Sequence, residues 1–256
     1  MDLGLTGKKF VVGGASKGLG RAVAEGLAKE GAQVLLLSRD EKALEAVAAG
    51  IGGGASYAVI DIGSADAAEK VAAAVDEKLG GLDGVLVNAG GPPPGEVLSL
   101  TDEQWAQSFQ LLIGGPIRLL RLLVPKMTNG GSVLFITSSS VRQPIPNLDS
   151  SNVLRPGVAA MAKTLARTLG PGIRVNTIAP GRFNTDRILQ LDKVRADAQG
   201  ITMEEQKEQM SKQIPLGRYG EPEELARLAT FLLSPAASYV SGVAIGVDGA
   251  MVTAIP

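Results

Sequence analysis

The sequence has no cysteine and no histidine, and only 4% of its residues are aromatic. Without cysteine, disulfides, thiolate nucleophiles and cysteine metal ligands are excluded. Without histidine, the chain lacks the commonest general base and the commonest transition-metal ligand, so we predict no metal site. Any proton transfer must therefore use Ser, Tyr, Lys, Asp, Glu, water or a bound cofactor.

An excess of charge of one sign is also missing, as are long apolar segments. The formal net charge is −1, which gives no reason to expect a nucleic acid or an acidic membrane surface as partner. No stretch approaches the ~20 apolar residues of a membrane helix, and the first residues do not have the layout of a signal peptide. We therefore expect a cytoplasmic protein with a small-molecule substrate, no membrane partner and no nucleic-acid partner.

What the sequence does contain is an alternation of seven short apolar runs with six longer stretches of helical pattern. The runs are KFVVGG, QVLLLS, YAVIDI, GVLVNAG, SVLFITS, IRVNTIAP and VAIGVDG. They are continuously apolar, as strands buried on both sides are. Alternation with helices is typical of a parallel sheet covered on both faces. We predict one α/β domain over residues 1–256, a Rossmann-like, doubly wound parallel sheet of about seven strands.

Several segments have an expected place in this domain. A dinucleotide-binding half is expected over about 1–140 and a substrate-side half over about 141–256, where the charged, helical segment 186–214 is a possible lid. The prolines 92–94 follow a strand's carboxyl end, where open α/β sheets bind ligands, so they are either purely structural or a wall of the substrate pocket. The segment 111–127 is apolar nearly all round, which leaves open burial within one subunit or an interface between subunits.

A glycine-rich segment, Gly13–Gly20, follows the first predicted strand and opens the first predicted helix. Gly14 permits a tight turn, Gly18 lets the backbone approach a pyrophosphate, and Gly20 lets the helix pack on the sheet. The helix N-terminus adds free N–H groups and a partial positive charge. The arrangement predicts a dinucleotide site, against the alternative of a glycine-rich turn without a ligand.

The end of the second predicted strand bears on the choice of cofactor. Sites that prefer NAD usually have an acid there, which binds the ribose 2′-hydroxyl. Here the strand ends at Ser38 and Arg39 follows, while Lys17 lies in the glycine loop. Two cations suit a 2′-phosphate, so we predict NADP(H) in preference to NAD(H). Two alternatives stay open: a turn could bring the Asp40 carboxylate to the ribose, and Arg39 could be an ordinary solvated arginine.

Motifs in order along nearly the whole chain resemble those of the short-chain dehydrogenase/reductase family. Residues 13–20 resemble the family's TGxxxGxG, residues 88–90 its NNAG, residues 173–185 its strand and loop with Pro-Gly, and residues 215–249 its C-terminal segment. The resemblance implies a Rossmann-like fold and an oxidoreductase that interconverts carbonyl compounds and secondary alcohols, as in the family's 3-oxoacyl-carrier-protein reductases. It also implies a homo-oligomer, a tetramer or a dimer.

The resemblance further implies contacts to a bound nicotinamide cofactor. It puts Asp61 at the adenine, the segment 88–90 near the adenosine ribose and Thr185 at the nicotinamide carboxamide. Together with the glycine loop, the cofactor residues expected are Gly14, Ser16, Lys17, Gly18, Leu19, Gly20, Arg39, Asp61, Ile62, Asn88, Ala89, Gly90, Arg155, Pro180, Gly181 and Thr185.

The chain departs from the family at the expected catalytic positions. The family's serine, tyrosine and lysine correspond in spacing to Ser138, Ser151 and Arg155, and its helical asparagine corresponds to Leu112. A serine hydroxyl is a far poorer acid than a phenol whose pKa a lysine lowers. Arginine is hardly a proton donor, but Arg155 could stabilise an oxyanion, bind the nicotinamide ribose, or lie at the surface. Ser138 is expected to orient the substrate.

Pro156 complicates the helix that follows. Because proline is tolerated in the first turn of a helix, we predict that this helix begins near Arg155. Ser150 or Ser151 would then be its N-cap, which is a structural alternative for Ser151.

Two functions stay open: an NADP(H)-dependent oxidoreductase with an unusual acid, and an NADP(H)-binding protein without redox catalysis, such as a sensor or an assembly partner.

Overall fold

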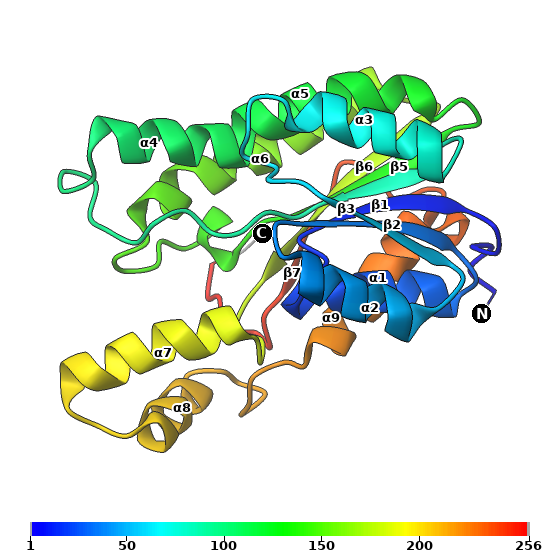
Figure 1. Cartoon of the computed structure of the whole chain (residues 1–256). Coiled ribbons are helices and arrows are strands. Elements are labelled where there is room, and N and C mark those ends of the chain that lie inside the picture. Colours follow the sequence, from blue (N-terminus) through cyan, green and yellow to red (C-terminus); the bar gives the residue numbers. More distant parts are fainter. Residues whose placement is uncertain (1, 255–256) are drawn as a thin grey trace.

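The structure, a computed structural model that describes residues 2–254, is built around a seven-stranded sheet (Figure 1). The strand order is β3-β2-β1-β4-β5-β6-β7, and every neighbouring pair is parallel. The order reverses beside β1, which is the crossover that defines a doubly wound sheet. The predicted single-domain, Rossmann-like α/β fold is confirmed.

Each of the seven predicted apolar runs overlaps one strand. The strands are β1 (Lys9–Gly13), β2 (Gln33–Ser38), β3 (Ala55–Val59), β4 (Gly84–Val87), β5 (Gly131–Ile136), β6 (Ile173–Pro180) and β7 (Ala244–Val247). The sequence predicted these strands because the central ones are buried on both faces. Residues on either face are then apolar, which gives a continuous apolar run.

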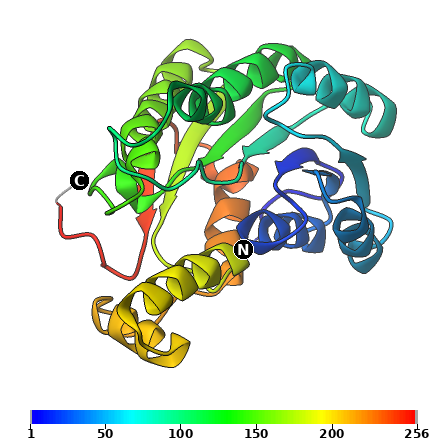
Figure 2. The ribbon, with the colours of Figure 1, turned by 60° about the vertical axis from the view of Figure 1, so that its left-hand side comes forward.

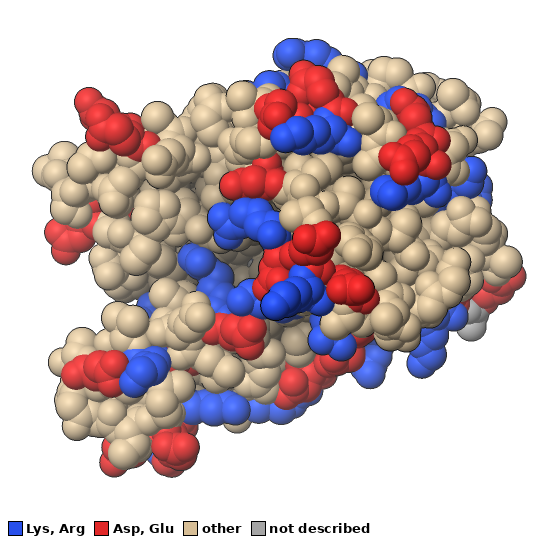
Figure 3. Space-filling view, viewed as in Figure 1, with Lys and Arg blue, Asp and Glu red and all other residues tan. Residues whose placement is uncertain are grey.

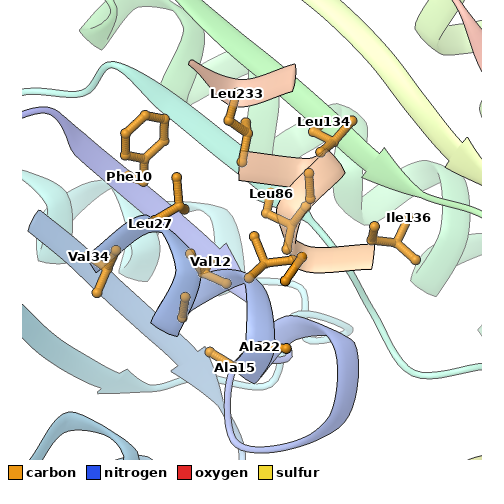
Figure 4. Close-up of a cluster of buried hydrophobic side chains, with 14 of the residues drawn as sticks. Phe10, Val12, Ala15, Ala22, Leu27, Val34, Leu86, Leu134, Ile136 and Leu233 are labelled. Atoms are coloured by element: carbon orange, nitrogen blue, oxygen red, sulfur yellow. The ribbon is translucent and has the colours of Figure 1, made fainter. Parts of the chain in front are cut away.

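Successive side chains on a strand enter different hydrophobic cores. On β1, Val11 packs into the cluster on one face of the sheet and Val12 into the cluster on the other face, as the two-residue period of a strand requires. Figure 4 shows the second cluster, in which Val12 and Leu86 from the sheet meet Leu27 and Leu233 from two helices. The two cores hold the helices on both faces and fix the edge at which the strands end.

Nine α-helices are present between residues 2 and 254, more than the six predicted stretches, because two connections hold several helices each. The helices are α1 (Gly18–Lys29), α2 (Glu41–Ile51), α3 (Ala67–Lys78), α4 (Asp102–Phe109), α5 (Gly115–Leu123), α6 (Asp149–Thr168), α7 (Asp186–Gln199), α8 (Met203–Lys212) and α9 (Pro222–Leu233). A π-helical turn, Gln110–Gly114, joins α4 to α5. In the described part of the chain, no helix combines the length and the apolarity that a bilayer crossing requires.

The helices form two layers and an arm. Helices α3 to α6 cover one face of the sheet, and α1, α2 and α9 cover the other (Figure 1). Helices α7 and α8 form an arm that projects from the body, which Figure 2 shows from a second side. This arm coincides with the segment predicted as a lid. Its movement, and the division into a dinucleotide half and a substrate half, stay predictions.

The prediction for the start of α6 is wrong. The helix begins at Asp149, with Leu148 as N-cap, and Pro156 lies inside it. Pro156 is exposed, so its ring meets water on the outer face of the helix. Ser150 and Ser151 therefore lie in the first turn and do not cap the helix. Ser150 Oγ instead donates to the carbonyl of Pro93 at 3.1 Å, which ties the proline loop to α6.

The arm is anchored to the body by a buried ion pair. Asp192 on α7 is 1% exposed and accepts hydrogen bonds from Arg182, just after β6, and from the hydroxyl of Tyr219 at 2.8 Å. The guanidinium of Arg182 also lies over the Tyr219 ring, 5.0 Å from its centroid. Burial is the main cause that raises the pKa of Tyr219 to about 12, so this hydroxyl stays a donor at neutral pH.

We expect Asp192→Ala to lower the free energy of unfolding by about 3–5 kcal/mol, because it leaves the Arg182 charge buried without its partner. Urea unfolding measures the change, and limited proteolysis within 186–214 reports the loosening of the arm. Asp197→Ala is the matched control: Asp197 is an exposed residue of the same helix, paired with Lys193 at 3.4 Å, and such pairs contribute little. Equal stability of both variants would contradict the anchoring role.

Candidate active site

The residues that the sequence singled out follow the carboxyl ends of different strands. The glycine loop follows β1, Asn88 follows β4, Ser138 follows β5, and Pro180 ends β6. Since the strands are parallel, these ends lie along one edge of the sheet, beside the reversal of strand order where such sheets bind ligands. The fold thus brings together residues that are far apart in the sequence.

The glycine loop is a cradle in which side chains would not fit. Gly14 has φ +62° and Gly18 has φ +56°, a region that favours glycine. A Cβ on Gly20 would overlap the Gly14 carbonyl and lie 2.8 Å from Asn88 Nδ2. That same Nδ2 donates to the carbonyl of Gly13 at 3.1 Å. The loop has little side-chain bulk, so an anionic group can approach the N–H groups at the N-terminus of α1. A dinucleotide pyrophosphate is such a group.

The residues expected at the adenosine end lie near the ends of β2 and β3. Ser38 Oγ donates to Ser16 Oγ at 2.8 Å, and Arg39 is exposed directly after β2. The Asp40 carboxylate accepts the backbone N–H of Ala43 at 3.1 Å and is the N-cap of α2. Capping engages one oxygen of this exposed carboxylate, and the alternative that Asp40 binds a ribose stays open.

The first turn of α7 lies against the glycine loop. Thr185 is the N-cap of α7, and a Cβ on Gly18 would lie 3.4 Å from its Cγ2. Beside it, the Lys17 ammonium is 3.5 Å from the Asp186 carboxylate. Both partners of this pair are well exposed, so it is weak, and an incoming phosphate would compete for Lys17.

The three expected catalytic residues lie at the end of β5 and the start of α6. Arg155 Nε donates to Ser151 Oγ at 3.0 Å, and its Nη1 donates to the carbonyls of Ile136 and Thr137 at 3.1 and 2.8 Å. The alternative of a surface arginine is therefore wrong, because Arg155 is only 9% exposed. Its Nη2 has no acceptor among residues 2–254.

A third serine, Ser140, which the sequence reading missed, joins this group. Ser140 Oγ is 3.4 Å from Ser151 Oγ, so a chain of polar groups runs from Arg155 through Ser151 to Ser140. Ser138 is also the cap of a short turn, in which its Oγ accepts the backbone N–H of Ser140 at 3.1 Å. The only signal for Ser140 in the sequence is the run of three serines. Leu112 is buried and has no polar group with which to hold a water.

A second arginine, Arg187 on the first turn of α7, was also missed. A Cβ on Gly91, just beyond β4, would overlap the Arg187 guanidinium. A larger residue at this position would therefore require the guanidinium to move away from that loop. Desolvation lowers the pKa of Arg187. Burial, and then the positive charge of Arg187, lower the pKa of Arg155 to about 10. Both groups stay charged at neutral pH, and no local sequence pattern predicts their proximity.

Basic side chains gather where the surface is hollowed. Figure 3 shows Lys and Arg atoms inside the recess between the arm and the body. Within residues 2–254, no group of three or more acidic side chains is arranged to hold a metal ion. Ser151, Ser140 and Arg155 offer hydroxyls and a guanidinium group, a set that binds anions and stabilises developing negative charge.

Comparison with known proteins agrees with this arrangement. The profile of a family described as Enoyl-(Acyl carrier protein) reductase matches residues 14–251. The chain belongs to the short-chain dehydrogenase/reductase family. A human family member, dehydrogenase/reductase SDR family member 4, is 33% identical over 254 residues, covering 96% of this chain and 87% of the relative.

Two solved structures of short-chain dehydrogenases/reductases are informative. L-sorbose reductase from Gluconobacter frateurii, crystallised with NADPH and L-sorbose, has a TM-score of 0.94 and 32% identity, and the match covers 100% of both chains. A short-chain oxidoreductase from Pseudomonas aeruginosa PAO1, described as containing an atypical catalytic centre, has a TM-score of 0.87 and 29% identity over 97% and 98% of the two chains. Family membership supports an oxidoreductase with a nicotinamide cofactor.

Proposed function

We propose that the chain is an NADP(H)-dependent oxidoreductase that interconverts a carbonyl compound and a secondary alcohol through an atypical active site. The observation that carries the proposal is the Arg155–Ser151–Ser140 group at the same sheet edge as the glycine cradle. The NADPH in the sorbose reductase complex supports the choice of cofactor, as does the exposed cation Arg39 at the end of β2.

NADPH supplies a hydride to the carbonyl carbon in such a reaction. On this chain, the glycine loop and the N-terminus of α1 would hold the pyrophosphate, and Thr185 would hold the carboxamide. The segment 88–90 and the residues Asp61 and Ile62 would border the adenosine, and Pro180 and Gly181 the nicotinamide. Arg39, with Lys17 released from Asp186, would bind the 2′-phosphate.

The negative charge that develops on the carbonyl oxygen would be met by Arg155. Nε and Nη1 are already engaged, so the guanidinium is fixed and its Nη2 is the donor left for the oxygen. A fixed cation in a site shielded from water stabilises an oxyanion without reorganisation. Ser138 would orient the substrate, and the proton would come from water along the hydroxyls of Ser140 and Ser151.

A second candidate is an NADP(H)-binding protein without redox catalysis. The observation that favours it is the use of Arg155 as a structural group, which binds two backbone carbonyls and a serine. In that case the cofactor site would be a sensor or an assembly element, and the hydroxyl chain would be only a packing feature.

Steady oxidation of NADPH with a panel of aldehydes and ketones tests the proposal. We expect turnover with at least one carbonyl, at least 10-fold slower in Ser138→Ala. We also expect kcat/KM to be constant between pH 6 and 9, because Arg155, with a pKa of about 10, is charged throughout and the chain has no histidine or cysteine. Tight NADPH binding without oxidation on any carbonyl would favour the second candidate.

Self-association and location are further parts of the proposal. A homotetramer or dimer fits the exposed apolar side chains of Phe109 at the end of α4, Ile117 on α5 and Val153 on α6, since such groups favour contact with another surface. Residence in the cytoplasm fits an NADP(H)-dependent reaction.

A further inference from the structure

Arg187, on the first turn of α7, is a cation without a hydrogen-bonding partner in the described part of the chain. Its guanidinium makes no hydrogen bond or ion pair within residues 2–254, whereas its neighbour Asp186 is paired with Lys17. It is exposed, although nearby protein atoms desolvate it enough to lower its pKa. It crosses from α7 to Gly91 on the β4 loop. An accessible arginine without an acceptor is a ready partner for an anion.

A nearby cation increases the need for such an anion. Arg155 is charged at neutral pH and close enough to Arg187 for the two charges to oppose each other. Among the described residues, no carboxylate pairs with either guanidinium. Two like charges near each other in partly desolvated surroundings are unfavourable until a negative group lies between them or beside them.

The cofactor phosphates are less suitable as this negative group. The pyrophosphate has the glycine loop and the N-terminus of α1, and the 2′-phosphate has Arg39 at the far end of the site. The part of the cofactor expected near Arg155 is the nicotinamide, which is neutral in NADPH and positive in NADP⁺. It therefore adds no negative charge. Arg187 instead reaches the loop that continues into the prolines 92–94, which we expect to border the substrate.

We propose that the substrate carries a carboxylate that Arg187 binds, so that the reaction interconverts an oxo acid and a hydroxy acid. This inference rests on the proposed function and names its substrate class. The carboxylate would face the Arg187 fork, and the carbonyl oxygen would face Arg155 Nη2 and Ser138. The carbonyl carbon gains the hydride that NADPH supplies, the oxygen gains a proton from water, and NADP⁺ and the hydroxy acid are the products. The carboxylate is unchanged.

The test compares acids with their neutral esters. In calorimetric titrations of the NADP⁺ complex, we expect 3-hydroxybutanoate to bind about 10- to 100-fold more tightly than methyl 3-hydroxybutanoate, the range for charge-assisted hydrogen bonds. Arg187→Gln should remove this difference and leave the Kd for NADPH within about 2-fold. In turnover, kcat/KM for 3-oxobutanoate should fall by the same factor in Arg187→Gln, and that for its methyl ester should not. The pair 4-oxopentanoate and methyl 4-oxopentanoate covers a longer spacing.

Lys193→Gln is the matched control, because it removes one exposed positive charge from the same helix. It should keep the preference for acids, and Arg187→Lys should keep part of it. The inference is overturned if the wild-type protein treats acid and ester alike in both pairs. It is also overturned if Arg187→Gln weakens NADPH binding about 10-fold, since Arg187 would then hold a cofactor phosphate. Acid-selective binding without oxidation of NADPH would support the carboxylate site and contradict the proposed redox function.

Discussion

Gly20→Ala should abolish tight NADPH binding, with a rise in Kd of about 100-fold or more. The new methyl group would overlap the Gly14 carbonyl, which belongs to the loop, and lie 2.8 Å from Nδ2 of Asn88, which packs against the loop. Relief requires the backbone of the loop to move away from α1. Two lost charge-assisted hydrogen bonds to phosphate account for a change of this size. Fluorescence titration of NADPH measures it.

Gly50→Ala is the matched control for this variant. Gly50 lies on α2, where an added Cβ would meet nothing within 4 Å, and alanine is the better helix former. It should leave NADPH binding unchanged and stability equal or slightly higher. Circular dichroism of Gly20→Ala separates a local change in the loop from general unfolding. A folded Gly20→Ala protein that binds NADPH like the wild type would contradict the role of the glycine loop in binding the cofactor.

The sheet edge was predictable from the sequence because it depends on local patterns. Continuous apolar runs such as the one in β5 identify strands buried on both faces, and parallel strands end at one edge. Glycines at 14, 18 and 20 mark backbone that must turn tightly or pack closely, and the structure has both features there. The family resemblance then assigned these motifs to positions in one known fold, over nearly the whole chain.

The start of α6 was predicted wrongly, and Arg187 and Ser140 were missed. These features depend on tertiary contacts, which local sequence patterns do not show. The rule that excludes proline from helix interiors led to a late start for α6, whereas α6 begins at Asp149 and contains an exposed Pro156. Arg187 resembles any solvated arginine of a charged helix. Its importance arises only because the fold brings the first turn of α7 over Gly91, which lies 96 positions earlier. Ser140 became visible only through its distance to Ser151.

Arg155→Met should lower kcat by about 10²–10³-fold, the usual cost of removing one donor from an oxyanion site. Methionine keeps much of the volume of the arginine stem but removes the donors to Ser151, Ile136 and Thr137, so some loss of stability is also expected. Arg142→Met controls for that loss, because Arg142 Nη2 likewise donates to a backbone carbonyl, that of Ala244, at 2.9 Å. Steady-state kinetics and urea unfolding on both variants separate the two effects.

The double variant Ser151→Tyr with Arg155→Lys then tests whether water supplies the proton in the wild-type protein. If Arg155 stabilises an oxyanion that water protonates, the wild-type pH profile is flat across neutrality. A phenol beside a lysine, in contrast, titrates below its usual pKa of about 10, so the double variant should gain a pH-dependent limb. A wild-type profile that already shows such a limb would point to a titrating acid, and would remove Arg155 from the role given to it here.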